Sequence, residues 1–367
     1  MNRPTMIALL LMTALAGPGG AAQLGSQDVL DTPALKSELA AKTLLNGVAL
    51  AGKRLVSVGW RGHILYSDNQ GKSWTQASVP VSSDLTAVSF PSPQKGWAVG
   101  HDGVVLHSSD GGATWAKQFD GRAAAQVMAT HHRSWKNCAA CHEKLTPPQG
   151  APASADDASL MADLKSFTQQ GPDKPFLDVW FENDSTGFIV GAFNLIFRTT
   201  DGGKIWEPWF DRTDNKKRLH LYRIQPVGQD IYIGGEQGLV LKLDRLAGRF
   251  KAVATPYQGS FFGVTGKPGV LVAFGLRGNA FRSLDGGSSW HKVETGVPAG
   301  LSGAAVTPDG RIVMVSQAGH VLISTDGAAS FTQFKVERPF AASAVAALDN
   351  DTLVLAGPHG VQVLPVK

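Results

Sequence analysis

The segment GWAVGHDGVVLHSSDGGATW, Gly96–Trp115, contains the two motifs that determine the fold. In its first half, an apolar strand ends in Gly-x-x-Gly and a second apolar strand follows. Seven such segments occur, and their second glycine or its equivalent is Gly62, Gly103, Asn194, Gly238, Gly278, Gly319 and Gly360. Successive positions are 41, 91, 44, 40, 41 and 41 residues apart. A fixed repeat of this length predicts an array of like units, and the long second step predicts an insertion.

The second half of the segment is a turn motif of the form S/T-x-D/N-x-G-x-S/T-W/F, the Asp box or BNR repeat. Its five copies are Ser67–Trp74, Ser108–Trp115, Thr199–Trp206, Ser283–Trp290 and Ser324–Phe331. The acidic or amide side chain accepts backbone N–H bonds within the turn, and the glycine supplies a left-handed backbone. The aromatic residue is expected to pack between neighbouring sheets. The motif therefore predicts a structural turn rather than a catalytic aspartate.

A repeat of this length with alternating apolar residues fits four short strands, which is one propeller blade. We therefore predict an all-β, seven-bladed β-propeller over residues 23–367. In the second unit the expected strands are 85–90, 96–100, 103–108 and one from Thr114. The last unit ends after its third strand, so residues near the mature N-terminus are expected to supply the fourth. The segment 34–46 is expected to be helical and to lie beside this closure.

The composition and the N-terminus indicate an exported protein. The chain has 367 residues, of which 17% are charged, and a net charge of +4. We see no block of Lys and Arg that would indicate a nucleic-acid partner. Residues 1–22 read as a signal peptide, with Arg3, an apolar stretch at 6–15 and small residues at 20–22. The expected location is the periplasm or an equivalent lumen, with peripheral membrane contact at most.

The residues between the paired glycines are expected to gather around one mouth of the central channel. Strand direction alternates within a blade, so these turns lie on the face opposite the Asp boxes. Loops on a rigid scaffold often carry function, and we predict a partner-binding rim there. The predicted rim residues are Trp60, Arg61, His101, Asp102, Phe193, Glu236, Arg277 and His359.

The predicted insertion, residues 121–174, contains two helical patterns and the sequence Cys138-Ala139-Ala140-Cys141-His142. CxxCH is the attachment motif of c-type haem, in which His142 would be the proximal iron ligand. A disulfide, a thiol redox pair, or a metal site with His131 or His132 are the alternatives. The candidate sixth haem ligands are Met128, His131, His132 and Met161. By its place in the topology, the insertion is expected over the same mouth as the rim.

The units GWAVGHDGVVLHSSDGGATW and FLDVWFENDSTGFIVGAFNLIFRTTDGGKIW resemble the photosystem II stability/assembly factor family. The resemblance implies an exported seven-bladed Asp-box propeller that acts as a non-enzymatic scaffold. It also implies a protein partner, a membrane-protein complex or its precursor. The arginine-rich surface implicated in photosynthetic members would correspond here to Arg61 and Arg277. The CxxCH insertion departs from the photosynthetic form and adds electron transfer as a hypothesis.

Two other function classes remain open at this point. Asp boxes also occur in sialidases, which are glycoside hydrolases that need an arginine cluster and a tyrosine nucleophile with a nearby glutamate. The segment Leu221–Pro226 (LYRIQP) is a near miss of the sialidase arginine motif. A haem-based redox enzyme or sensor is the other alternative, which an open sixth iron position would favour.

Overall fold

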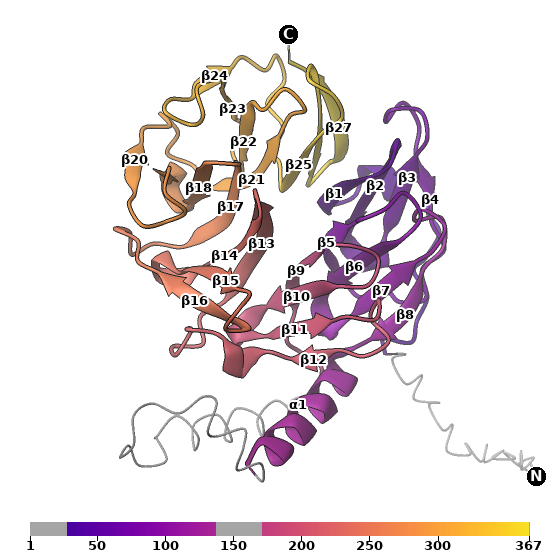
Figure 1. Cartoon of the computed structure of the whole chain (residues 1–367). Coiled ribbons are helices and arrows are strands. Elements are labelled where there is room, and N and C mark those ends of the chain that lie inside the picture. The colour runs from indigo at the N-terminus through magenta and orange to yellow at the C-terminus, as the bar shows by residue number, and fades with distance from the viewer. Residues whose placement is uncertain (1–27, 137–170, 367) are drawn as a thin grey trace, which may run out of the picture.

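The computed structural model describes residues 28–136 and 171–366. Their strands form seven antiparallel sheets arranged around a central axis, as Figure 1 shows. Six sheets have four strands and one has three. This confirms the predicted seven-bladed β-propeller. In the described part of the chain, no helix is long and apolar enough to span a bilayer.

Within each blade the strands follow one another in sequence order from the axis outwards. Blades 1 to 4 comprise β1 (Leu45–Ala51), β2 (Arg54–Gly59), β3 (Ile64–Ser67), β4 (Thr75–Gln76); β5 (Leu85–Ser89), β6 (Gly96–Gly100), β7 (Val105–Ser108), β8 (Ala116–Phe119); β9 (Phe176–Phe181), β10 (Gly187–Gly191), β11 (Ile196–Thr199), β12 (Glu207–Pro208); and β13 (Leu221–Val227), β14 (Asp230–Gly235), β15 (Val240–Asp244), β16 (Arg249–Val253). Blades 5 to 7 comprise β17 (Phe261–Lys267), β18 (Val270–Gly275), β19 (Ala280–Ser283), β20 (His291–Val293); β21 (Leu301–Val306), β22 (Ile312–Ser316), β23 (Val321–Ser324), β24 (Thr332–Phe334); and β25 (Ala344–Ala347), β26 (Thr352–Gly357), β27 (Gly360–Pro365).

The helical elements are short apart from one. The α-helix α1 (Gly121–Lys136) follows blade 2 and begins the predicted insertion. The 3-10 turns are η1 (Ala40–Lys42), η2 (Trp60–Gly62), η3 (His101–Gly103), η4 (Ala192–Asn194), η5 (Phe210–Arg212), η6 (Glu236–Gly238) and η7 (Leu276–Gly278). Five of them, η2, η3, η4, η6 and η7, are the Gly-x-x-Gly turns of the repeat.

Burial explains the residue types of the strands. The second strand of a blade is sandwiched between its neighbours and between adjacent blades, so β6 and β10 are buried at every position. Aromatic side chains fill the space between blades. Trp97 of blade 2 stacks on Phe181 of blade 3 with ring centroids 3.6 Å apart and planes 11° apart. The Asp-box residue Trp115 is likewise buried between blades 1 and 2.

The strand boundaries expected in the second unit agree well with the structure. β5 and β6 begin at the predicted residues, whereas β7 begins two residues after the predicted Gly103. The reason is that Gly103 belongs to the turn, with a left-handed backbone at φ 63°. Its missing side chain also leaves room for Gly121, because a Cβ on Gly103 would lie 2.7 Å from the Gly121 Cα.

The closure of the ring differs from the prediction. The described residues near the N-terminus add no fourth strand to blade 7; they lead into β1, the innermost strand of blade 1. The two blades meet through side chains instead. Ala40, Leu45 and Leu65 of the N-terminal part pack with Ala344 and Ala356 of blade 7 in one buried cluster. Apolar packing rather than a shared sheet closes the ring in the described structure.

The helix predicted for 34–46 is also wrong, apart from η1. Residues 28–44, which we call the strap, run beside the link between blades 1 and 2. Ala34 N donates to Val79 O over 3.1 Å, and Ser82 N donates to Val29 O over 2.8 Å. Leu30 is fully buried against this link. Tertiary burial thus overrides the helix propensity of this Ala- and Leu-rich segment.

Candidate functional site

The Gly-x-x-Gly turns form a ring of exposed tips on one face of the propeller, which we call the rim face. In every blade the two residues before the second glycine or asparagine include an exposed side chain, and that glycine or asparagine itself is buried. The structure places all eight predicted rim residues in these tips: Trp60, Arg61, His101, Asp102, Phe193, Glu236, Arg277 and His359. The links between consecutive blades lie on the same face.

Five of the tips share an uncommon backbone. Arg61, Asp102, Phe193, Gln237 and Arg277 have φ between 52° and 58°, the left-handed region. Residues other than glycine seldom adopt it, since it costs on the order of 1 kcal/mol or more. The repeated turn therefore holds each of these side chains in a fixed, outward position. A scaffold that presents fixed side chains loses little entropy when it binds a partner.

The rim at blade 1 combines an aromatic ring with a cation. The Arg61 guanidinium carbon lies 4.5 Å from the centre of the Trp60 ring, a cation–π contact. Arg61 N donates to Asp84 Oδ1 over 2.7 Å, which ties the tip to the following link. Trp60 remains 41% exposed. This arrangement leaves one face of the indole available for contact with another molecule.

Aromatic rings form a continuous run across blades 3 to 5. The Phe193 and His220 ring centroids are 4.6 Å apart, those of His220 and Tyr222 are 6.2 Å apart, and those of Tyr222 and Phe262 are 5.6 Å apart. Lys174 Nζ lies 5.5 Å from the Phe193 ring centre. Only Phe193 belongs to the predicted rim. The run therefore extends the rim inwards, from the turn tips to the innermost strands.

The inner aromatics sit at a recurring irregularity. The strand register shifts between Leu221 and Arg223, and again between Phe261 and Gly263, so Tyr222 and Phe262 occupy equivalent bulges. The sequence does not single out Tyr222 and Phe262, because the alternation of apolar and polar residues marks them only as strand residues. Burial, and secondarily the Glu236 carboxylate, raises the pKa of Tyr222.

Glu236 connects this run to the rim. The His220 backbone N donates to Glu236 Oε2 over 2.8 Å, and His220 Nδ1 lies 3.3 Å from the same oxygen. The tip of blade 4 is thereby fixed to the link that precedes it. The same carboxylate acts on Tyr222, so a Tyr–Glu pair does exist in this chain. The sequence does not show this pair, because Tyr222 lies on the strand β13 and Glu236 lies in the turn η6.

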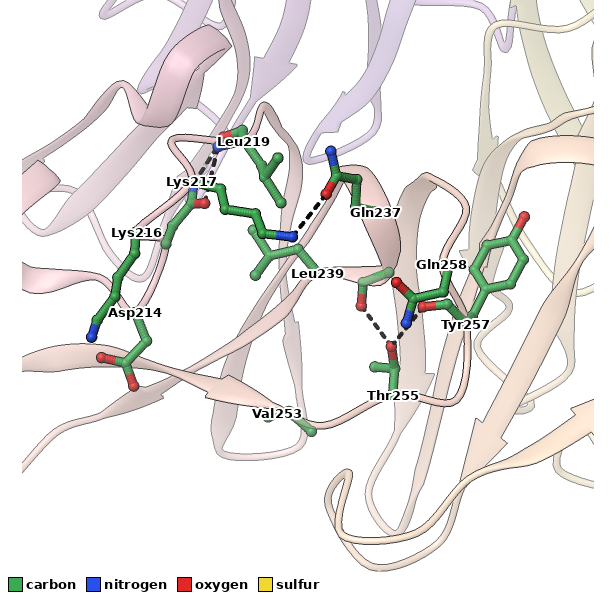
Figure 2. Close-up of a pocket in the computed structure, with 12 residues that line it drawn as sticks. Asp214, Lys216, Lys217, Leu219, Gln237, Leu239, Val253, Thr255, Tyr257 and Gln258 are labelled. Atoms are coloured by element: carbon green, nitrogen blue, oxygen red, sulfur yellow. Dashed lines mark hydrogen bonds between the residues drawn. The ribbon is translucent and has the colours of Figure 1, made fainter.

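A groove of about 370 Å³ lies beside the tip of blade 4. Figure 2 shows the side chains that surround it, and Lys217 Nζ donates to Gln237 Oε1 over 3.2 Å. Thr255, which also lines the groove, donates a hydrogen bond from Oγ1 to Gly238 O over 2.7 Å. The wall residues are Asp214, Asn215, Lys216, Lys217, Leu219, Gln237, Gly238, Leu239, Val253, Thr255, Tyr257 and Gln258. The basic run 216–218 is the sequence signal for this groove, and three charges in a row are too short a pattern to stand out.

A second cavity, of about 280 Å³, is lined by the innermost strands of blades 1 to 4 and by residues of blades 6 and 7. Asp178 is buried there and accepts a hydrogen bond from Ile224 N over 2.9 Å. Arg223 Nε lies 4.0 Å from the same carboxylate oxygen. Burial raises the pKa of Asp178 to about 6, although Arg223 and the Ile224 N–H act in the opposite direction.

Of the insertion, the structure describes residues 171–174 and the helix α1. It begins against η3 on the rim face, but it packs along the outer strand β12 rather than over the mouth (Figure 1). Met128 is buried in the core, and His131 Nε2 lies 3.2 Å from Asp211 Oδ2. Two of the four candidate sixth ligands thus already have structural partners. His132's side chain, Met161 and the motif Cys138, Cys141, His142 lie outside the described residues.

The Asp boxes behave as structural turns. In blade 2, Asp110 Oδ1 accepts hydrogen bonds from the backbone N of Ala113 and Thr114, and Ser108 Oγ donates to Asp110. In blade 5, hydrogen bonds from Ser289 and Ser283 hold the pKa of Asp285 well below its usual range. These carboxylates are engaged in hydrogen bonds within their own turns.

Several features of the described structure weigh against a sialidase. Arg223, in the near-miss motif, faces Asp178 in the channel, and no cluster of three arginines surrounds the Tyr222–Glu236 pair among the described contacts. Within residues 28–136 and 171–366, no group of three His, Cys, Asp or Glu side chains is placed to hold a metal ion. What the rim face offers is contact area, charge and aromatic rings.

Comparison with known proteins shows that the chain is similar to photosystem II assembly factors. Residues 42–131 and 165–253 match the family model described as photosynthesis system II assembly factor YCF48. The chain is 29% identical over 160 residues to the photosystem II assembly lipoprotein Ycf48 of Synechococcus sp. (strain CC9902), covering 42% of this chain and 46% of that protein. A solved structure, YCF48 bound to D1 peptide, superposes with a TM-score of 0.62 at 15% identity, covering 92% of this chain and 99% of that one.

A glycoside hydrolase is also similar. The chain is 25% identical over 304 residues to a xyloglucanase of Hypocrea jecorina (strain QM6a), covering 62% of this chain and 36% of that protein. The matches therefore span less than half the length of both curated relatives. The structural likeness to YCF48 at 15% identity establishes the fold alone.

Proposed function

We propose that this chain is a non-enzymatic binding scaffold, because it resembles the photosystem II assembly factor YCF48 in repeat, motif and fold. It holds an extended segment of a membrane protein, or of its precursor, while a complex is assembled. The observation that carries the proposal is the placement of the exposed tips, the aromatic run and the groove on one rigid face. That a relative is described as bound to a D1 peptide supports a peptide as the ligand class.

The proposed ligand contacts follow from the chemistry of the rim face. Arg61 and Arg277 supply exposed cations on blades 1 and 5, and Lys216 and Lys217 supply two more at the groove. Phe193 is 55% exposed and can cover an apolar side chain of the ligand. Such an arrangement favours an extended segment that alternates apolar and acidic residues. Export to the periplasm or lumen is part of the proposal, and the description of one relative as a lipoprotein supports it.

Replacing Arg61 and Arg277 together by alanine is expected to weaken partner capture by about fivefold to tenfold without unfolding the chain. Both side chains are exposed, and neither is needed for the packing of the blades. The readout is photo-crosslinking in cells from a probe at Leu276 on the rim face, with a matched probe at Leu246 on the Asp-box face. Crosslinks to membrane proteins should come from Leu276 alone. Equal yields from the two probes, or a yield unchanged in the double variant, would contradict the proposal.

Covalent haem in the insertion is a separate part of the proposal. Its support is the CxxCH motif of residues 138–142 in a chain with a signal-peptide-like N-terminus. Cys138 and Cys141 would form the thioethers and His142 would bind the iron. Since Met128 is buried and His131 is paired with Asp211, neither is free to be the sixth ligand in the described arrangement. Neither the fold nor the relatives support a role in electron transfer.

The haem prediction is tested by expression in a host that matures c-type cytochromes. The purified protein should show a Soret band and an intact mass increased by one haem. A Cys138→Ser, Cys141→Ser variant is the control and should lose both signals. A mass decreased by two hydrogen atoms, with no Soret band, would indicate a disulfide instead.

A glycoside hydrolase is the weaker candidate. The similarity to a xyloglucanase favours it, as does the Tyr222–Glu236 pair. The Asp-box carboxylates, however, are engaged in their turns, and Arg223 is paired with Asp178. Glycosidase chemistry needs two carboxyl groups on either side of a bound sugar, or a tyrosine nucleophile with an arginine cluster. The described rim face offers neither arrangement.

A further inference from the structure

Exposed apolar side chains are concentrated where the strap crosses blade 1. Leu35, Leu39, Leu44 and Trp60 are all exposed, Leu35 by 75% and Leu39 by 61%. Leu44 and Trp60 are joined through their backbones, because Trp60 N donates to Leu44 O over 3.0 Å. We call these four residues the strap patch. Isolated exposed leucines are ordinary, but four large apolar side chains on one short segment and its neighbouring tip form a surface that water does not favour.

The strap patch is held firmly from beneath. Leu30, Ala34 and Ala40 on the same segment pack into the protein, and the latter two flank Leu35 and Leu39 in sequence. The segment is also fixed to β4. Gln76 Nε2 donates to Leu35 O, and the backbone N of Ser37 donates to Gln76 Oε1, both over 2.9 Å. The strap is therefore a built surface that presents its leucines outwards, rather than a loose tail.

Cations border the strap patch. Lys42 is exposed two residues before Leu44, and the Arg61 guanidinium lies over the Trp60 ring. Lys36 Nζ is bound to the carbonyl oxygens of Gln76 and Ala77. The acidic groups beside them are Glu38 and Asp84, and Asp84 is engaged by the Arg61 backbone. Leucine and tryptophan bordered by Lys and Arg is the composition of segments that lie in the interface of a bilayer.

We infer that the strap patch docks on the surface of a lipid bilayer that contains anionic headgroups. The side chains of the patch protrude from the surface, and none of its residues lines either described cavity. A bilayer needs no pocket, because it admits protruding side chains. Docking there would turn the rim face towards the membrane, and it does not depend on which protein the rim holds.

The test is co-sedimentation of the purified exported chain with vesicles of phosphatidylethanolamine and phosphatidylglycerol, compared with phosphatidylcholine alone. The wild-type chain should bind the anionic vesicles and keep part of that binding at high salt, because apolar insertion is not screened. The triple variant Leu35→Ser, Leu39→Ser, Trp60→Ala should lose about tenfold or more in bound fraction. The melting temperature should be unchanged, since the substituted side chains are exposed.

A control variant separates this contact from general stickiness. Ile205, Leu246 and Leu284 are large, exposed apolar residues in the turns between the third and fourth strands of their blades, on the opposite face. Replacing these three by serine should leave vesicle binding as in the wild type. The inference is overturned if the wild-type chain does not bind vesicles, if the strap variant binds as well as the wild type, or if the control variant loses binding to the same degree. Each of these results leaves the crosslinking test of the rim unaffected.

Discussion

Replacing Gly278 by alanine is expected to destabilise the propeller by at least about 4 kcal/mol, close to the whole stability of many domains. Gly278 has a left-handed backbone with φ 72°, and a Cβ there would lie 1.6 Å from Val297 O. The obstacle is the backbone of the link to blade 6, which cannot move easily. Thr295 Oγ1 fixes that link by donating to Gly278 O over 2.7 Å. The measurement is urea unfolding followed by tryptophan fluorescence.

Gly269→Ala is the matched control. Gly269 also has a left-handed backbone, with φ 81°, but nothing lies within 4 Å of the position of its Cβ. Its substitution should cost only about 1 kcal/mol, the conformational part of the effect. If the two variants unfold at the same urea concentration, the close approach of turn and link does not restrain the blades. The same approach occurs at Gly238, whose Cβ would lie 1.8 Å from Tyr257 O.

The Asp178→Asn variant is expected to be more stable than the wild type at pH 8 and equal to it near pH 4. The pKa of Asp178 is raised to about 6 by burial, so the folded state binds its proton more tightly than the unfolded state. Stability from this group is therefore present at low pH and is lost as the pH rises through 6. The full difference is about 3 kcal/mol, since one pKa unit corresponds to about 1.4 kcal/mol. Asparagine keeps an acceptor for Ile224 N without the buried charge.

The measurement compares the free energies of unfolding of the wild type and the variant at pH 4, 6 and 8. Taking the difference cancels the titration of all other groups. Asp178→Ala is the control, because it removes the charge and also leaves Ile224 N without its acceptor. It should be less stable than Asp178→Asn by about 1 to 3 kcal/mol at every pH. A difference between wild type and Asp178→Asn that does not vary with pH would show that the carboxylate titrates normally in the channel.

The architecture was predictable because the repeat is local. Each Asp box fixes its own turn through side chains within eight residues, such as Ser108 and Asp110. The spacing between second glycines then sets the length of a blade, and seven copies give seven blades. At Gly62, Gly238 and Gly278 the following link passes so close that no Cβ fits, whereas blade 3 has Asn194 at the equivalent position. Short-range chemistry repeated at one period is the kind of information that a sequence displays directly.

The strap and the ring closure were not predictable in the same way. Residues 34–46 have the composition of a helix, and their real conformation is set by contacts with the link that follows β4, some forty residues on. No local sequence pattern indicates that Leu30 is buried or that Gln76 binds the backbone at Leu35 and Ser37. Propensity decides only where tertiary contacts do not.

The candidate site was likewise predictable only in part. The exposed tips were predictable, because residues between two turn glycines must lie at the surface. Tyr222 and Phe262 were not, because only the bulges of neighbouring blades bring them together. The groove beside Gln237 depends on three separate segments, of which Lys216–Lys217 is one. A site built from several blades appears only when the ring is closed.

The ring has a seam between blades 7 and 1, where no covalent link joins the neighbouring blades. Every other pair of neighbouring blades is joined by a covalent link. At the seam, the two blades are held together by apolar contact among Ala40, Leu45, Ala344 and Ala356. Opening this seam would expose the apolar surfaces of both blades at once. Loss of the segment around Ala40 would then leave each terminal blade with a bare flank, and unravelling would proceed from there in both directions around the circle.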